Sequence, residues 1–194
     1  MLRILLITSV LSSAALCSPS GLDAFQSRAS DDNIVSIYSK DNFCMIMPRD
    51  PHTDIGTSEH PGGMQTYCSA QGHYSSQQGK LPDDFWSYVK FEEGLGKNGK
   101  KYVQLTGCIR PAHFSQLNAG DDGGQYDSSG GAKGRGNPEG SICQRYNHYI
   151  EIVEPAGPRA CIRCCDDPVD CPTNKDVDKD GCPKVIPGSY SGCA

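Results

Sequence analysis

Short runs in which apolar and polar side chains alternate recur along the chain from residue 33 onward. They are rich in Val, Ile and Tyr and are separated by turn-forming residues, which is typical of strands because successive strand side chains face opposite sides. No long stretch keeps the helical period of about 3.6 residues. The predicted strands are residues 33–39, 42–48, 64–70, 85–91, 101–109, 145–154 and 159–165. We therefore predict an all-β fold, a single sandwich or small barrel with long irregular loops.

Two connections between predicted strands have the composition of tight turns. Residues 94–101 (GLGKNGKK) have the glycine spacing of a dinucleotide-binding loop, but a strand follows instead of the helix that such a loop requires. The Asn-Gly pair in this stretch favours a hairpin turn. Residues 154–160 (EPAGPRA) predict a second tight turn, in which Gly157 permits a positive φ that other residues resist. Before the strand at 85–91, Asp83 could cap a short helical turn.

The first 17 residues have the pattern of a secretory signal peptide. Arg3 gives a positive start, the apolar run that follows is too short to cross a bilayer, and small residues precede a cleavage point near Ser18. We predict removal of residues 1–17 and export of the remaining chain. Residues 18–32 have no periodicity and are expected to be a disordered N-terminus or a short prosegment, and residues 33–194 are expected to form the domain.

The cysteine content predicts a disulfide framework. The chain has eleven cysteines, and loss of Cys17 with the signal peptide leaves an even set, which outside the cell indicates disulfides. In a reducing cytosol the CxxCC stretch would favour a zinc site instead. Neighbouring Cys164 and Cys165 are expected to reach different partners, because a bridge between neighbours strains the peptide that joins them. The predicted disulfide residues, whose pairing stays open, are Cys44, Cys68, Cys108, Cys143, Cys161, Cys164, Cys165, Cys171, Cys182 and Cys193.

Disulfides would also stabilise a small core. Apolar residues make up 37% of the chain, which also has 22 glycines and 13 prolines, and each ordered residue costs roughly 1–2 kcal/mol of backbone entropy. A native disulfide typically adds about 2–4 kcal/mol. Residues 166–194 have almost no strand pattern, so we predict an irregular tail that Cys171, Cys182 and Cys193 hold to the domain.

The glycine-rich stretch at residues 119–140 has almost no apolar content and predicts a mobile, exposed loop. Long loops on compact domains often carry binding residues. We hypothesise that this loop contacts an extracellular protein or glycan through Asp121, Asp122, Tyr126, Asp127, Lys133 and Arg135. Aromatic side chains give a large contact area at low entropy cost, so Trp86 and Tyr146 are further candidates, with core packing as the alternative for Trp86.

The stretch DVDKDG at residues 176–181 places three carboxylates at alternate positions ahead of a glycine, as in the opening of a calcium-binding loop. An EF-hand requires a bidentate Glu at position 12 of the loop, where this chain has Pro187. A looser calcium site formed by Asp176, Asp178 and Asp180 is therefore one hypothesis, and a solvated acidic turn is the other. No other cofactor is predicted.

Charge and motifs argue against several classes of function. The chain carries a net charge of −5 at pH 7, whereas nucleic-acid binders show a basic stripe, and no later apolar run is long enough to span a membrane. The GxSxG motif of serine hydrolases is absent. Glycoside cleavage requires two facing carboxylates, and the candidates by residue type alone are Asp83, Asp84, Asp121 and Asp122.

The stretches GGMQTYCSAQG, GNPEGSICQRYNHYIEI, RACIRCCDDPVDCP and GCPKVIPGSY resemble small cysteine-rich secreted proteins of fungi, over most of residues 34–194. The resemblance implies an exported, disulfide-bonded protein of fungal type. It implies no catalytic residues, because that group has no settled activity. We therefore interpret the chain as a secreted, non-enzymatic binding protein, for which an effector-like role outside the cell would fit. The alternative is an extracellular hydrolase that acts on cell-wall polysaccharide.

Overall fold

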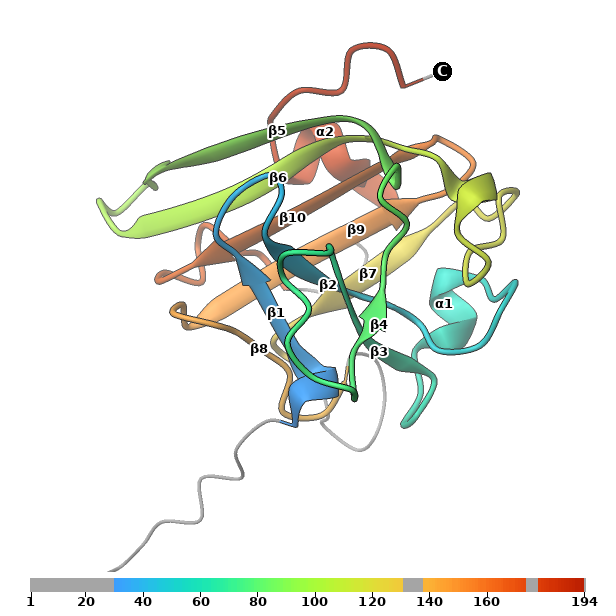
Figure 1. Ribbon diagram of the computed structural model, residues 1–194. Helices are drawn as coiled ribbons and strands as arrows, with labels where there is room; N and C mark the ends of the chain where they lie inside the picture. The colour runs from blue at the N-terminus through green and yellow to red at the C-terminus, as the bar shows by residue number, and fades with distance from the viewer. Residues whose placement is uncertain (1–29, 131–137, 174–177, 194) are drawn as a thin grey trace, which may run out of the picture.

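The computed structural model describes residues 30–130, 138–173 and 178–193. In these residues ten strands form two five-stranded sheets, which face each other as a sandwich and do not close into a barrel (Figure 1). The first sheet has the strand order β4-β3-β2-β1-β8, and the second has the order β5-β6-β10-β9-β7. The all-β prediction is confirmed, and of its two alternatives the sandwich is observed.

The first sheet has a two-residue strand at each edge, whereas the second sheet is built mainly from long strands. The strands of the first sheet are β1 (Ile34–Ile37), β2 (Phe43–Pro48), β3 (Met64–Cys68), β4 (Gly79–Lys80) and β8 (Ile142–Cys143). Those of the second are β5 (Trp86–Leu95), β6 (Lys101–Ile109), β7 (Gly124–Asp127), β9 (His148–Glu154) and β10 (Arg159–Cys165). Neighbouring strands are antiparallel except for the parallel pairs β1–β8 and β3–β4.

The helical elements are short connections around the sandwich. They are η1 (Asp31–Asn33), α1 (Ile55–Ser58), η2 (Pro111–His113), η4 (Asp178–Asp180) and α2 (Gly181–Val185). Among the described residues, no helix has the length and apolar character needed to cross a membrane.

Each of the seven predicted strands overlaps an observed strand, and both predicted turns are present. In the β5–β6 turn Gly96 N donates to Lys100 O, and Gly99 has a φ of 68°. The glycine spacing there therefore belongs to a hairpin. In the β9–β10 turn Gly157 N donates to Glu154 O.

Two local details differ from what the sequence suggested. Gly157 does not adopt the positive φ that a glycine permits. Asp83 does not cap a helix: it lies in a turn closed by a hydrogen bond from Phe85 N to Pro82 O, and β5 begins at Trp86.

The glycine-rich stretch at 119–140 contains a strand that its composition does not predict. Gly124–Asp127 form β7, an edge strand that pairs with β9, so the prediction of an exposed loop is wrong for these residues. Tyr126 in this strand is fully buried. A Cβ atom on Gly124 would lie 2.8 Å from the Ile55 side chain. Close packing against α1 therefore requires a glycine at position 124. The residue is not there to make the chain flexible.

Alternate side chains of β10 face two different layers of the molecule. Ala160, Ile162 and Cys164 belong to the main core between the two sheets. Cys161 and Cys165 belong to a second apolar cluster on the outer face of the second sheet. The strand is buried on both sides, as expected where something covers each face of a sheet.

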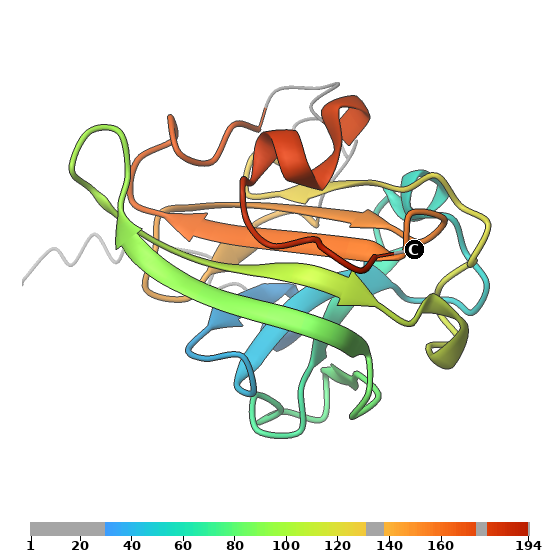
Figure 2. The same ribbon diagram turned by 90° about the horizontal axis from the view of Figure 1, so that it is seen from above.

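The C-terminal tail covers the outer face of the second sheet. α2 lies over β9 and β10 (Figure 2), and Ile186 packs in the outer cluster with Ile150 and Ile152. β9 therefore buries both of its faces, which explains why its sequence shows no clean division into apolar and polar sides. The predicted cysteine-clamped tail is confirmed, although it contains short helices.

All ten predicted cysteines form disulfides. Cys143–Cys164 joins the two sheets, and Cys44–Cys68 joins the neighbouring strands β2 and β3. The C-terminal tail is held by Cys165–Cys171, Cys161–Cys182 and Cys108–Cys193. Cys164 and Cys165 have different partners, as predicted, because neighbours in a strand face opposite sides. A set of five disulfides is typical of a protein in an oxidising, extracellular environment.

Residues 1–29 lie outside the described part of the chain. The signal peptide predicted at 1–17 and most of the segment predicted at 18–32 therefore stay predictions. Only the end of that segment is described, and there Asp31–Asn33 form η1. Asp32 belongs to the folded domain, because its carboxylate forms an ion pair with Arg49 at 3.1 Å.

Candidate functional site

A cleft of about 310 Å³ lies where the β1–β2 turn meets the segment that leads into β5. We call it the Trp86 cleft. One wall comes from the β1–β2 turn and the residues after β3, and includes Lys40, Asp41, Phe43 and Gln71. The other wall comes from the start of β5 and the residues before it, and includes Asp83, Phe85 and Trp86. The cleft thus combines aromatic rings with carboxylate, amine and amide groups.

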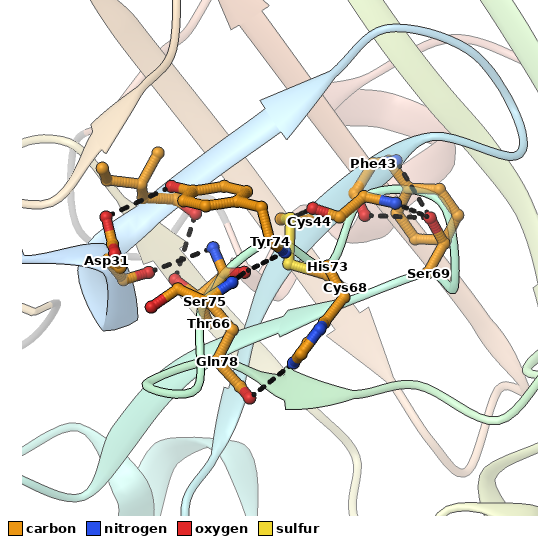
Figure 3. Close-up of a disulfide and its surroundings, with 12 residues drawn as sticks. Asp31, Phe43, Cys44, Thr66, Cys68, Ser69, His73, Tyr74, Ser75 and Gln78 are labelled. Carbon is orange, nitrogen blue, oxygen red and sulfur yellow. Dashed lines mark hydrogen bonds between the residues drawn. A yellow bond between two sulfur atoms is a disulfide. The ribbon is translucent and has the colours of Figure 1, made fainter.

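The first wall is held in place by Ser69 and a disulfide (Figure 3). The Ser69 hydroxyl accepts a hydrogen bond from Phe43 N at 3.2 Å. It also donates one to Asp41 O at 2.8 Å. Cys44, which follows Phe43, and Cys68, which precedes Ser69, form the β2–β3 disulfide. The β1–β2 turn and the loop after β3 therefore act as one unit.

The loop between β3 and β4 is fixed a second time by the buried side chain of Gln78. Its Oε1 accepts hydrogen bonds from Tyr74 N at 3.1 Å and Ser75 N at 3.3 Å (Figure 3). Its Nε2 donates to Asp31 O at 3.3 Å, which ties the loop to η1. These hydrogen bonds fix the backbone of the β3–β4 loop, whose first residues line the cleft.

Aromatic packing forms the second wall. The Phe85 ring is buried and meets Trp86 edge-on, with ring centroids 5.2 Å apart, and the tilted Phe43 ring lies 6.1 Å from Trp86. Arg110 fixes the backbone behind them, because its Nη1 donates to Asp84 O at 2.8 Å and to Trp86 O at 3.0 Å. Edge-on aromatic rings at such distances stabilise a fold by more than the burial of their apolar surface alone.

Trp86 packs against the core and also borders the cleft, while its contact with a partner stays a prediction. Its side chain is half-buried. Within the described residues its indole Nε1 is buried with no hydrogen-bond acceptor. The position of the ring is therefore set by packing and not by a polar contact. Tyr146, the other aromatic candidate, is half-buried against the core away from this cleft.

The four carboxylates considered for catalysis do not converge. Asp83 lines the Trp86 cleft and is exposed. Its neighbour Asp84 accepts a hydrogen bond from His113 Nδ1 at 2.7 Å, and this bond lowers the pKa of the Asp84 carboxyl. Asp121 and Asp122 lie in the connection to β7 and do not line the cleft.

Asp121 links the connection before β7 to the start of α1. One carboxylate oxygen accepts a hydrogen bond from Ile55 N at 2.8 Å, and the other accepts one from Gly123 N at 3.1 Å. Asp122 is exposed, so of this acidic pair only Asp122 keeps the surface position expected of a partner contact.

Tyr126 and Asp127 cannot contact a partner in this structure because they are buried. The Tyr126 hydroxyl forms a hydrogen bond with the Ser58 hydroxyl at 2.7 Å, and burial raises the Tyr126 pKa well above its usual range. Asp127 accepts a hydrogen bond from Ser129 N at 2.7 Å and so shapes the turn after β7. The other two residues of the proposed contact set, Lys133 and Arg135, lie outside the described residues.

The calcium hypothesis stays a prediction. Asp176 lies outside the described residues, and of Asp178 only the backbone, in η4, is described. The Asp180 carboxylate accepts a hydrogen bond from Lys184 Nζ at 2.6 Å, four residues later. Among the described side chains, no group of three or more candidate ligands lies close enough to hold a metal ion.

Sequence reasoning missed most residues of the Trp86 cleft. Lys40, Asp41 and Gln71 come from two segments with no shared motif, and each has the composition of an ordinary turn. The available signal was the position of Cys44 and Cys68 beside these two segments. Their pairing would have brought the segments together, but pairing cannot be deduced from a sequence with ten such cysteines.

Comparison of the chain with protein-family models, with curated proteins and with solved structures gives no match. The proposals that follow therefore depend on the chain's own geometry and chemistry.

Proposed function

We propose that this protein is an extracellular, non-enzymatic binding protein that holds a glycan in the Trp86 cleft. The main support is the combination of aromatic rings and hydrogen-bonding side chains around one opening. A sugar ring has C–H groups that pack against aromatic surface and hydroxyl groups that need both donors and acceptors. A site for such a ligand therefore needs mixed walls, with apolar surface for contact and a few polar groups for orientation.

The size and rigidity of the cleft fit this ligand class. Ligand pockets commonly measure about 300–1,000 Å³, so a cleft of about 310 Å³ suits one or two sugar units of a longer chain. The first wall is fixed by Ser69 and the Cys44–Cys68 disulfide. A preformed wall lowers the entropy cost of binding, because little protein structure has to be ordered.

Replacing Trp86 with Ala is expected to weaken retention on the bound polysaccharide by about tenfold or more, because a central aromatic contact of this kind contributes about 2 kcal/mol or more. The measurement is depletion of the purified protein by insoluble chitin, cellulose and β-glucan. Tyr88→Ala is the matched control: Tyr88 is an exposed aromatic residue on the same strand that does not line the cleft. Equal loss in both variants, or no retention of the wild type on any glucan or chitin, would contradict the proposal.

The hydrolase alternative has one supporting observation, the presence of Asp41 and Asp83 in the same cleft. Release of reducing sugar from the retained polymer, abolished by Asp83→Asn, would establish catalysis. Asp84→Asn is the control, since Asp84 is an exposed neighbour bonded to His113. Binding without release, weakened about threefold to tenfold in Asp83→Asn through loss of a charged hydrogen-bond acceptor, is the outcome that we expect.

A further inference from the structure

A second cleft, of about 470 Å³, lies on the outer side of the second sheet. It is bounded by the β5–β6 turn, the segment after β10 and α2. The turn and the segment after β10 lie at the same end of that sheet, and α2 lies over β9 and β10 (Figure 2). The side chains that matter for its chemistry are Lys97, Tyr102, Arg163, Asp170, Asp180 and Lys184. None of them belongs to the Trp86 cleft, so the two sites are separate.

Arg163 lies at the base of this second cleft. It projects from the outer face of β10, directly opposite Gln104 of β6. Its Nε and Nη2 donate to Gln104 Oε1 at 2.8 and 2.6 Å, and its Nη1 donates to Asp170 O at 3.2 Å. The guanidinium carbon lies 4.8 Å from the centre of the Tyr102 ring. The guanidinium is therefore held in one orientation by three hydrogen bonds and a stacked ring.

All three of these hydrogen bonds go to uncharged acceptors. A guanidinium has five N–H groups, so two remain without an acceptor among the residues that the structure describes. The same residues supply no ion pair to Arg163. Arg163 is half-buried, and this burial lowers the pKa of its guanidinium from the usual value. A partly buried cation of this kind is stabilised by an anionic partner.

Neither of the nearest carboxylates is bonded to the guanidinium. Gln104 lies between Arg163 and Glu92, and its Nε2 donates to Glu92 Oε2 at 3.1 Å, while Glu92 also pairs with Lys90 at 2.9 Å. Asp170 accepts a hydrogen bond from Lys97 N at 3.1 Å through Oδ1, whereas its buried Oδ2 has no hydrogen-bond partner among the described residues. Both carboxylates act to raise the pKa of Arg163, against the larger effect of burial.

The charges around the cleft indicate the ligand charge. Lys97, Arg163 and Lys184 are cations, whereas Asp170 and Asp180 are carboxylates, so the lining carries one net positive charge. Lys184 and Asp180 neutralise each other through their ion pair at 2.6 Å. One positive charge and two free N–H groups on a planar fork match a single planar carboxylate better than a doubly charged phosphate.

We propose that this cleft binds the carboxylate of a small organic acid, with Arg163 as the group that receives it and Lys97 at the rim. The apolar body of the ligand would lie against Tyr102 and the adjoining side chains of Leu95 and Val185. A uronic acid sugar and an amino-acid residue are two sources of the same carboxylate group. This proposal does not depend on glycan binding in the Trp86 cleft.

The test uses the disulfide-bonded protein and four probes at low salt. These are glucuronate, its neutral counterpart glucose, N-acetylleucine and inorganic phosphate, each titrated while amide chemical shifts are followed by NMR. Glucuronate or N-acetylleucine is expected to shift the signals of Arg163 and Gln104, and the stronger of the two identifies the source. Glucose is expected to leave these signals unchanged. The affinity should fall as salt is added, because salt screens the attraction between the charges.

Two variants separate the site from general charge effects. Arg163→Met is expected to weaken binding by about tenfold or more, since it removes charge-assisted hydrogen bonds. If that variant does not fold, Lys97→Met tests the rim, where a loss of about threefold is expected from a partly exposed charge. Lys100→Met is the matched control on the same turn, and it should bind like the wild type because Lys100 does not line the cleft.

Three results would overturn the proposal. The first is the absence of any shift at Arg163 with both organic acids at high millimolar concentration. The second is an equal loss of affinity in Lys97→Met and Lys100→Met, which would indicate general attraction to a basic turn. The third is tighter binding of phosphate than of either carboxylate. None of these results bears on retention of the protein on polysaccharide.

Discussion

Removal of the disulfide between the two sheets, by the double substitution Cys143→Ala and Cys164→Ala, is expected to lower the free energy of unfolding by about 3–5 kcal/mol. The two cysteines are 21 residues apart, and both are buried. Alanine avoids placing an unpaired hydroxyl in the core. In a domain of this size, each kcal/mol corresponds to about 2–4 °C in melting temperature. Thermal and chemical unfolding of the variant, with the other disulfides intact, would measure the loss.

The Cys44–Cys68 disulfide provides a matched control, because its sequence separation of 24 residues gives nearly the same loop-closure entropy. Its two strands are already paired at five positions from Cys44↔Cys68 to Pro48↔Met64. β8, by contrast, has two residues and one neighbour in its sheet, β1. We therefore expect the Cys143–Cys164 removal to cost about 1 kcal/mol more than removal of the control disulfide. An equal or larger loss for the control would show that the link between the sheets adds nothing to the folded state.

The adjacent cysteines illustrate what the sequence can determine. Alternation predicts β10, and side chains that alternate in a strand send Cys164 and Cys165 to opposite faces. Different partners for the two cysteines follow from that alone. Which partners they reach depends on what covers each face, and this is a property of the whole fold. The inner partner Cys143 comes from the other sheet, and the outer partner Cys171 comes from the tail.

The strands that were missed share a physical cause. β4 and β8 have two residues each, too few to show any alternation, and they exist because a longer neighbour offers free backbone groups. β7 is longer, but its sequence GQYD has one large apolar residue, Tyr126, which fills the core from an otherwise polar segment. Intrinsic preference is weak in such cases, and pairing with β9 decides the structure.

Candidate binding residues were harder to predict than strands. Composition marked the glycine-rich stretch as a surface loop, yet its aspartates Asp121 and Asp127 bond to backbone N–H groups and shape turns. Asp and Asn are common in turns for this reason, so their presence in a loop does not distinguish binding from structure. The polar residues of the two clefts come from segments far apart in the sequence, and only the fold brings them together.

Replacement of Glu151 with Gln is expected to make the protein more stable at neutral pH and to flatten the pH dependence of its stability. Glu151 projects from β9 into the core and is fully buried. Its Oε2 accepts a hydrogen bond from Ile46 N at 3.0 Å, whereas its Oε1 has no partner among the described residues. Burial raises the pKa of this carboxyl well above its usual value, and only the bond from Ile46 N opposes the change. Burial without a cation therefore favours the neutral form of this carboxyl.

The direction of the pH effect follows from proton binding. Because the pKa of Glu151 is higher in the folded state, its contribution to stability is fully present below the unfolded pKa of about 4.5 and is lost as the pH rises through the folded pKa. Across that window the free energy of unfolding should fall by about 1.4 kcal/mol per pH unit from this group. Glutamine keeps the acceptor for Ile46 N and never ionises, so the slope should disappear. Denaturant unfolding at a series of pH values would measure it.

A neighbouring glutamate on the same strand gives the control. Glu154 forms two hydrogen bonds with the Arg159 guanidinium, at 2.7 and 2.8 Å, and accepts another from Cys182 N at 3.0 Å. Glu154→Gln breaks this ion pair and should lower stability at neutral pH by about 1–3 kcal/mol. The two substitutions make the same chemical change on one strand, so opposite signs would show that a buried carboxyl without a cation destabilises the fold at neutral pH. A Glu151→Gln variant less stable than the wild type at neutral pH would contradict this and would indicate that the ionised carboxylate is satisfied within the core.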